Sequence, residues 1–312
     1  MQRSRDQLVA LARRYYLDGV SQQELAKEFG VSRPTVASML KQCREEGIVE
    51  IRIRDGSPLA TALGEKLQDA FGLDRAVIVP SRQDSPANLQ NVGAEAASFV
   101  APLMTDGIRI GLAWGTSLYH LVHQLPPRHA LDAEVIQLLG GLGPSHAIYD
   151  GQELARHLAH HLGARYFPLQ SPILVHSQEL KEMLLKEPGI RSTIERMEGL
   201  DMALVGVSSN NPDESALVRA GFLSSREAQE IYSSGAIGHI CGYHYDGEGK
   251  LLDHPANQRI VGIAPEVFRK IPRRVGVACG ASKAKALLGA LRGGWLTDLV
   301  TDEAAALRLL GD

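Results

Sequence analysis

The stretch "GIRIGLAWGTSLYHLV", residues 107–122, decides the fold of most of the chain. Its first half, 107–114, is a short apolar run typical of a buried strand. Gly115, Thr116 and Ser117 then open a segment with helical spacing. A strand, a turn of small residues and the start of a helix form a common cradle for an anion, because the free N–H groups of a helix N-terminus attract negative charge. The stretch therefore predicts a strand–turn–helix unit and a candidate anion site.

Units of this kind recur along the chain. Short apolar runs that we expect to form strands lie at 75–80, 107–114, 133–141, 164–169, 202–209 and 273–280. Helical stretches separate most of them. This alternation predicts an α/β domain with a doubly wound, mostly parallel sheet. In such sheets ligands bind beyond the carboxyl ends of the strands.

Three small-residue loops follow predicted strands and are the candidate binding loops. They are "AWGTS" at 113–117, "LLGGLG" at 138–143 and "ACGASK" at 278–283. A single loop of this kind is usually only a turn, but three in one sheet, with Lys283 in the third, favour a site. Three loops and a lysine suit a phosphate better than a carboxylate. None matches a dinucleotide fingerprint or a phosphate-binding P-loop.

The first 54 residues predict a separate helical module. Leu8, Leu11, Ala12 and Tyr15 recur at the spacing of one helix face. The segment "SQQELAKEFG", 21–30, predicts a second helix that begins with a capping box formed by Ser21 and Glu24. A third helix is expected in "VSRPTVASMLKQCREEG", 31–47, and a strand in "GIVEIRIR", 47–54.

The third helix has the character of a DNA-recognition helix. Val36, Met39 and Leu40 occupy its inner face. Short polar and basic residues are expected on its open face or at its start, and the candidate DNA contacts are Ser32, Arg33, Thr35, Ser38 and Lys41. Two helices, a glycine turn and such a third helix predict a helix-turn-helix that binds a double-stranded DNA operator. A small helical domain without nucleic acid is the alternative.

Charge and length agree with this division. A chain of 312 residues is longer than an average domain, so we expect two, at 1–54 and 55–312. The first holds ten Lys/Arg and seven Asp/Glu, a net charge of +3, and the second holds 23 and 29, a net of −6. A basic N-terminal part joined to an acidic remainder indicates that only residues 1–54 bind a polyanion.

The remaining composition excludes several classes of protein. The chain has no apolar run of about 18 residues, so no membrane span is expected. Three widely spaced cysteines fit neither a zinc site nor a disulfide framework, and they favour a reducing cytoplasm. No cofactor or metal is predicted.

The chain resembles the SorC family of bacterial regulators of sugar metabolism from about residue 8 to 310. The segments that carry the resemblance are the helix-turn-helix at 15–53 and "AWGTSL", "VIQLLGGLG", "GHICGYHYDGEG", "NQRIVGI" and "ACGASKAKALLGALRGGWLTDLVTDEAAALRLL", in that order. The resemblance implies an effector domain related to the sugar-phosphate isomerase and deaminase fold. It also implies tetramers and a small sugar effector, usually phosphorylated.

The resemblance also implies which residues line the effector cleft. They are Gly115, Thr116, Ser117, Gln137, Gly141, Asn257 and Lys283, with His239 where the family often has an acidic residue. A neutral imidazole donates or accepts a single hydrogen bond at each nitrogen and cannot act as a carboxylate. The effector of this chain is therefore expected to differ from the common ones.

An enzyme of the isomerase or deaminase type fused to a helix-turn-helix is the alternative function. Such chemistry needs a base near a substrate carbon. Asp201, Asp246 and His239 are candidates, but they form no recognisable acid–base set. His157 and His161 are spaced as a metal pair would be, yet they lie off the apolar stripe of their helix and favour a solvated face. The sequence therefore predicts a sensor rather than an enzyme.

Overall fold

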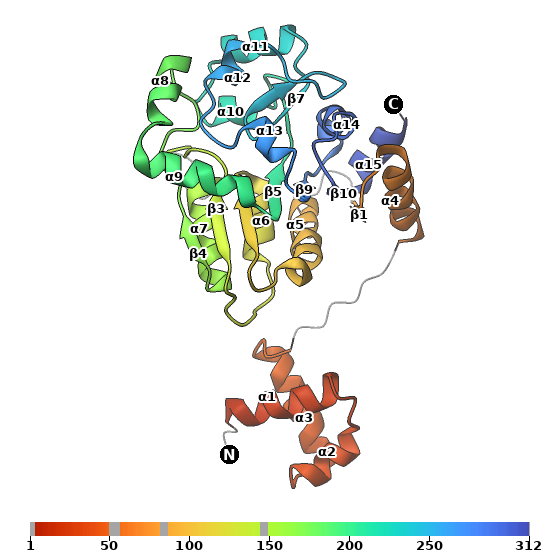
Figure 1. Ribbon diagram of the computed structural model, residues 1–312. Helices are drawn as coiled ribbons and strands as arrows, with labels where there is room; N and C mark the ends of the chain where they lie inside the picture. The colour runs from red at the N-terminus through yellow and green to blue at the C-terminus, as the bar shows by residue number, and fades with distance from the viewer. Residues whose placement is uncertain (1–3, 50–56, 82–86, 144–148, 312) are drawn as a thin grey trace. The chain divides into compact units, whose positions relative to one another are not determined.

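A computed structural model describes residues 4–49, 57–81, 87–143 and 149–311 (Figure 1). The chain divides into two compact units, Met1–Gly56 and Ser57–Asp312. This division falls two residues from the one expected. The strand predicted at 47–54 lies outside the described residues from residue 50 onward, and residues 47–49 contain no strand.

The first unit consists of α1 (Arg5–Tyr16), α2 (Gln22–Glu28) and α3 (Arg33–Glu45). The predicted capping box of α2 is present: Ser21 Oγ accepts from Glu24 N–H, and the Glu24 carboxylate accepts from Ser21 N–H. The Ser32 hydroxyl caps α3, whose first turn tolerates Pro34 because a proline there loses no hydrogen bond. The predicted starts of both helices are confirmed.

A small hydrophobic core holds the three helices of this unit together. Its buried residues are Leu8, Leu11, Ala12, Leu25, Val36, Met39, Leu40 and Cys43. Tyr15, Ala26 and Phe29 pack around them and are partly buried. The helix faces predicted to point inward are those that form this core. The opposite face of α3 is consequently left to solvent.

The second unit contains, among its described residues, a seven-stranded parallel sheet. In spatial order its strands are β1 (Arg75–Val79), β10 (Asp298–Asp302), β9 (Arg273–Val277), β5 (Met202–Gly206), β2 (Arg109–Leu112), β3 (Glu134–Gln137) and β4 (Arg165–Phe167). The chain winds outward from β2 through β3 to β4, and in the opposite direction from β5 through β9 to β10. The doubly wound parallel sheet predicted from the sequence is confirmed, with the direction of winding reversing between β2 and β5.

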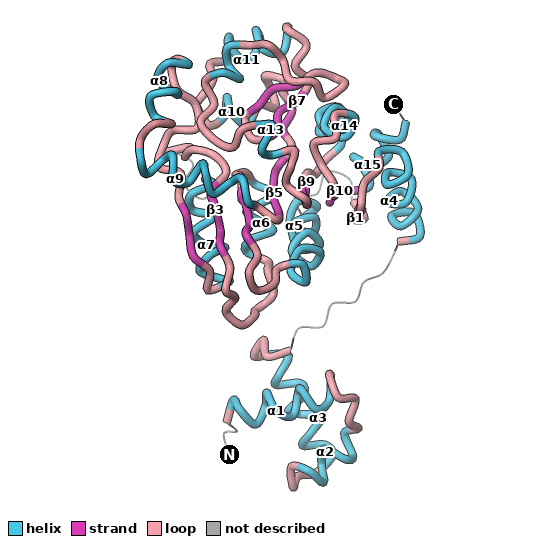
Figure 2. The backbone as a smooth tube through the Cα atoms, viewed as in Figure 1, coloured by secondary structure: helices cyan, strands magenta, loops and turns pink. Residues whose placement is uncertain are grey.

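Helices lie on both faces of the sheet (Figure 2). They are α4 (Pro58–Phe71), α5 (Ala87–Val100), α6 (Thr116–His123), α7 (Gly151–Leu162), α9 (Pro188–Arg196) and α15 (Glu303–Gly311). Helix α8 (Gln178–Leu184) lies beyond the end of the sheet (Figure 1), and α14 (Ala284–Arg292) packs against α15 and the strand Gly238–Ile240. Helix α6 packs against both α5 and α7, while α9 lies over β3 on the other face (Figure 1). Helices α4 and α15 cover the β1–β10 edge. No described helix is long and apolar enough to cross a membrane.

A second, antiparallel sheet of three very short strands adjoins the carboxyl end of the first. It contains β6 (Ser208–Ser209), β7 (Gly238–Ile240) and β8 (Tyr243–Tyr245). The connections around it hold α10 (Ala216–Arg219), α11 (Ser225–Ser233), α12 (Pro255–Gln258) and α13 (Pro265–Phe268), and the 3₁₀ turn η4 (Ala281–Lys283) contacts β6. Two other 3₁₀ turns, η1 (Ala101–Leu103) and η3 (Met197–Gly199), precede β2 and β5 of the large sheet. The run 202–209, expected as one strand, is therefore split between the two sheets.

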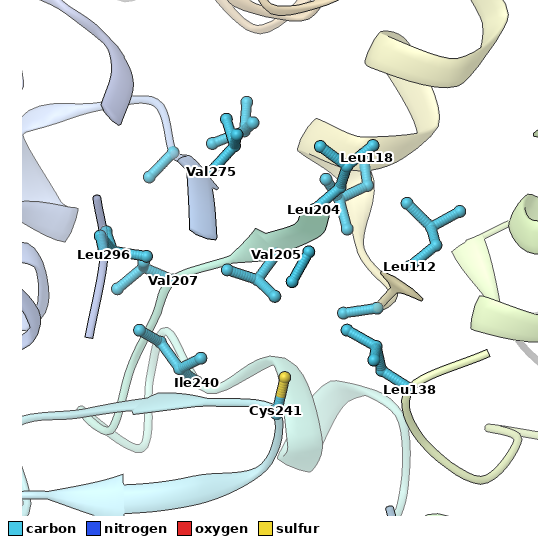
Figure 3. Close-up of a cluster of buried hydrophobic side chains, with 14 of the residues drawn as sticks. Leu112, Leu118, Leu138, Leu204, Val205, Val207, Ile240, Cys241, Val275 and Leu296 are labelled. Atoms are coloured by element: carbon cyan, nitrogen blue, oxygen red, sulfur yellow. The ribbon is translucent and has the colours of Figure 1, made fainter. Parts of the chain in front are cut away.

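The apolar core continues from the large sheet into the small one. Figure 3 shows Ile240, the last residue of β7, and Cys241, which follows it, beside Val205 of β5 and Val207 just after β5. These side chains are at most 6% exposed. Because this packing fixes β7 above the end of β5, a side chain on β7 can reach the loops at the carboxyl end of the large sheet.

Candidate functional site

A pocket of about 430 Å³ lies beyond the carboxyl ends of the central strands. Its walls include residues that directly follow β2, β5 and β9, and one from β7. Strands β2 and β5 are neighbours from which the chain winds in opposite directions, so the crevice between them is the place where open α/β sheets bind ligands. The position of the pocket therefore follows from the strand order.

The loop after β2 forms one wall of the pocket. Gly115 has φ of 123°, a backbone conformation that favours glycine, and its N–H donates to Tyr149 O (3.1 Å). Thr116 and Ser117 follow as the first residues of α6 and line the pocket. Leu118, fully buried, anchors the helix. Gly115 is the N-cap of α6 and has no side chain, so no side chain caps the first N–H groups of this helix.

The loop after β9 forms a second wall and is held by Asp302, at the end of β10. Gly280 N–H donates to Asp302 Oδ1 (3.0 Å), and the Cys279 thiol lies 3.7 Å from Oδ2. Asp302 Oδ1 also accepts from Ala305 N–H (3.2 Å), which ties the loop to α15. Lys283 ends the 3₁₀ turn that follows and is the N-cap residue of α14 rather than a residue of its first turn.

Two cationic side chains line the pocket, Lys283 and Arg219 of α10. Burial, and next the charge of Arg219, lower the pKa of Lys283. Among the described residues that line the pocket, none is an aspartate or a glutamate. Glu214, which does not line the pocket, acts on Lys283 in the opposite direction. The wall itself holds two cations and no carboxylate among its described residues, so the pocket is suited to an anion.

His239 of β7 also lines the pocket and is only 3% exposed. Its Nε2 atom is buried and has no hydrogen-bond partner in the described part of the chain. Burial, followed by the neighbouring His244 and the charge of Lys283, lowers the pKa of His239 well below its ordinary value. The imidazole is therefore neutral at physiological pH.

Five of the eight predicted effector residues meet in this pocket, namely Gly115, Thr116, Ser117, His239 and Lys283. Gln137 is not among them. Its Nε2–H donates to Leu139 O (2.6 Å), and its Oε1 accepts from the Tyr166 hydroxyl and from Leu169 N–H. These bonds use the side chain of Gln137 to join β3 to the segment after β4, so it holds the framework instead of facing the pocket.

Asn257 and Gly141 also lie outside the pocket. The Asn257 amide bonds the N–H and C=O groups of His244 and the C=O of Leu252, which leaves it no free group for a ligand. Gly141 lines a separate hollow of about 480 Å³, next to Asp150 and Ser171. Asn257 and Gly141 therefore shape the loops in which they lie and do not line the pocket.

The predicted DNA-contact residues share the solvent-facing side and the start of α3. Ser32, Arg33, Ser38 and Lys41 are exposed, and Thr35 is half-buried. The Ser32 and Thr35 hydroxyls lie 2.8 Å apart and also organise the first turn of the helix. Arg33, Ser38 and Lys41 present one hydroxyl and two cations from the exposed side of α3, as a helix that enters the major groove requires.

The sequence did not single out Arg219 or Asp302. Arg219 lies on a helix of four residues, which is too short to produce a periodic pattern. Asp302 ends a strand whose sequence, "DLVTD", carries a carboxylate at both ends, so it lacks the apolar run expected of a central strand. The one feature of the sequence that could have pointed to Asp302 is its position directly before the apolar helix α15.

The residues considered for an enzyme do not meet. Asp201 accepts from the N–H of Arg109 at the amino end of the sheet, opposite the pocket. Asp246 organises a turn by accepting from Glu248 and Lys250 N–H groups. His157 stacks on His123 (centroids 4.2 Å apart). Within the described ranges, no group of three His, Cys, Asp or Glu side chains is placed to hold a metal ion.

A helix-turn-helix unit joined to an α/β domain with an anion-suited pocket defines the class of ligand-sensing DNA-binding proteins. Comparison with known families agrees. Residues 59–311 match the Sugar-bind family of sugar-binding domains, and residues 2–61 match the Crp-like helix-turn-helix domain. The chain belongs to the SorC family of sugar-binding transcriptional regulators.

Individual relatives are similar over their full lengths. The transcriptional regulator YjhU of Escherichia coli (strain K12) is 34% identical over 95% of this chain and 92% of its own. The deoxyribonucleoside regulator of Bacillus subtilis (strain 168) is 30% identical over 100% of both chains. The crystal structure of the full-length sorbitol operon regulator SorC from Klebsiella pneumoniae superposes with a TM-score of 0.83 at 27% identity, covering 99% of this chain and 100% of that one. These relatives are regulators, and the alternative of an isomerase or deaminase is not supported.

Proposed function

We propose that this regulator binds a double-stranded operator through α3 and that a phosphorylated sugar in the 430 Å³ pocket controls this binding. The observation that carries the proposal is the charge of the pocket. Lys283 and Arg219 line it, the N-terminus of α6 opens onto it, and the described wall residues include no carboxylate. A sugar phosphate supplies the missing negative charge together with hydroxyl groups for the polar wall.

The phosphate is assigned to the cationic side of the pocket. Thr116 and Ser117 offer hydroxyl and N–H donors at the start of α6, and Lys283 offers an ammonium group. Backbone donors at a helix start and a nearby cation are a recurrent phosphate site. Two relatives whose names refer to sorbitol and to deoxyribonucleosides support a sugar-type effector.

We assign Gln137, Gly141 and Asn257 to supporting roles. The side-chain amides of Gln137 and Asn257 form hydrogen bonds with backbone groups around the pocket. Gly141 forms a bridge with Pro172, and a Cβ atom at position 141 would lie 3.3 Å from the Asp150 carboxylate. Each keeps a loop in place without touching the effector.

We propose that the regulator acts in the cytoplasm as a homotetramer. A single small helix-turn-helix unit buries too little surface for tight specific binding, so paired half-sites and at least a dimer are needed. Sedimentation at micromolar protein with operator present measures the assembly, and a strictly monomeric mass would contradict it.

The test of the proposed function combines a ligand screen with operator binding. The operator is first selected from random DNA with the full chain. Sugar phosphates and the matching free sugars are then compared by thermal shift, since a ligand of the folded state raises its apparent stability. We expect a phosphorylated sugar to raise the Tm and to change operator affinity, measured by fluorescence anisotropy. Stabilisation by a free sugar but by none of its phosphates would refute the phosphate assignment.

A further inference from the structure

One wall of the pocket comes from the small sheet and differs in character from the cationic wall. Ser208, His239 and His244 face each other across β6, β7 and β8, because they are register partners. Directly paired residues of antiparallel strands project from the same face of the sheet. Ser208 and His239 line the pocket, and His244 is not among the lining residues. This wall therefore presents polar groups without a fixed charge.

The hydrogen bonds of His244 are supplied by the protein. Its Nδ1 lies 3.0 Å from Asn210 Oδ1, and the same amide donates through Nδ2 to Gly238 O. Since that amide oxygen can only accept, Nδ1 of His244 carries the proton. Burial lowers the pKa of His244 to about 3, so it stays neutral. Its ring meets that of His239 edge to face, with centroids 5.6 Å apart.

His239 has no comparable partner. It is 97% removed from solvent, and its Nε2 is bonded to no atom of the described residues. Leaving a buried polar atom unpaired costs about 1–3 kcal/mol. Such an atom in the wall of a ligand pocket is explained when the ligand itself completes the hydrogen bond.

We propose that His239 hydrogen-bonds an uncharged hydroxyl or carbonyl group of the effector, and that this pairing makes the pocket select hydroxyl-bearing over amino-bearing sugar phosphates. This inference rests on the proposed function, in which Lys283 and Arg219 hold the phosphate.

The selectivity follows from the charges around His239. The titratable and charged groups that act on it are His244 from β8 and Lys283 from η4, while Arg219 from α10 lies at the same pocket. None of them is negative. A neutral imidazole can donate to or accept from a hydroxyl group. An ammonium group would meet two cations in the wall, whereas Glu214, the carboxylate that acts on Lys283, does not line the pocket. An ammonium group would therefore enter the pocket at a cost.

The test uses pairs of ligands that differ only at this group. Binding of inorganic phosphate, glucose 6-phosphate, glucosamine 6-phosphate, galactose 6-phosphate and galactosamine 6-phosphate to the full chain is measured by calorimetry. We expect the hydroxyl member of a pair to bind at least about tenfold tighter than its amino counterpart. In His239→Asp this preference should shrink or reverse. Equal or tighter binding of the amino sugars by the parent protein would overturn the inference.

A second set of variants separates contact from folding. His239→Leu should weaken sugar phosphate binding roughly 5- to 100-fold and leave inorganic phosphate binding unchanged. His239→Gln, whose amide offers a donor and an acceptor in place of the imidazole, should recover part of the loss. His160→Leu, on the exposed face of α7, is the matched control. Equal loss for sugar phosphate and inorganic phosphate in His239→Leu would contradict a contact with the sugar.

The pH profile gives an independent readout. Between pH 6 and 8 the affinity of the parent protein and of His239→Leu should change in parallel, because a neutral His239 takes up no proton. Proton uptake by the parent that vanishes in the variant would show a charged His239 and refute the neutral pairing. Inorganic phosphate binding that Lys283→Ala abolishes, without any hydroxyl sugar phosphate binding, would overturn this inference alone. No binding of inorganic phosphate would remove the proposed anion site as well.

Discussion

Replacing Lys283 by methionine should weaken effector binding without lowering the stability of the free protein. Lys283 is partly buried at the pocket, and no carboxylate of the described wall pairs with it. A charge-assisted hydrogen bond contributes about 1.5–3 kcal/mol, so its loss should weaken effector binding roughly 10- to 150-fold. Arg219 is exposed and can recover at most about 1 kcal/mol of this.

The unliganded protein should not lose stability in the same variant. Burial and Arg219 lower the pKa of Lys283, which means that its charged form is less favourable in the folded than in the unfolded chain. This penalty is present at every pH below the lowered pKa and disappears as the pH rises toward the unfolded value of 10.5. At pH 7 we therefore expect the Tm of Lys283→Met to equal or exceed that of the parent.

The assay pairs calorimetric titration of the effector with thermal unfolding of the free protein. Lys285→Met is the matched control, because Lys285 is exposed, lies two residues further on and does not line the pocket. Effector affinity equal to that of the parent would refute the role of Lys283. A Tm that falls by several degrees in the free variant would refute the electrostatic reasoning, since it would show that the lysine stabilises the fold.

Three further outcomes follow from the same structure. Arg33→Ala should weaken operator binding in gel shifts by about 1–3 kcal/mol while effector binding stays unchanged, and Arg13→Ala on the exposed side of α1 serves as its control; equal losses would contradict the α3 assignment. Thr116→Val keeps the shape of the first loop but removes a hydroxyl, so effector affinity should fall by about 0.5–1.5 kcal/mol in calorimetry, and an unchanged value would mean that the loop is only a turn. Asp302→Asn should lower both the Tm and the effector affinity, because it weakens the bonds that Asp302 accepts from Gly280 and Ala305; a loss of Tm alone would show that the loop after β9 is not part of the site.

The sequence predicted the elements whose signals are local. The capping box of Ser21 and Glu24 and the helix faces of the first unit depend on spacing within one helix, and all were found. The loop at Gly115 was predicted for the same reason, since an apolar run, a small residue and a helix start lie within a few residues.

The sequence could not predict contacts between distant segments. Gln137 and Asn257 have the residue types of a sugar site, and only the fold shows that backbone groups at Leu139, Leu169 and His244 already occupy their amides. Arg219 enters the pocket from a four-residue helix with no periodic signal. Strand β10 was missed because its burial comes from β1 and β9 on either side and not from an apolar pattern of its own.

The pocket is assembled from loops that start at the ends of different strands, and this has a consequence for how such a regulator can change its effector. Each strand keeps its register through its neighbours, whatever follows it. Substitutions at positions such as Ser117, Ser208 or Arg219 therefore alter one wall and leave the others and the sheet intact. The ligand specificity of the pocket can thus be changed by substitutions in one wall while the sheet is kept. A biosensor for a new metabolite could be evolved from a library restricted to a single loop.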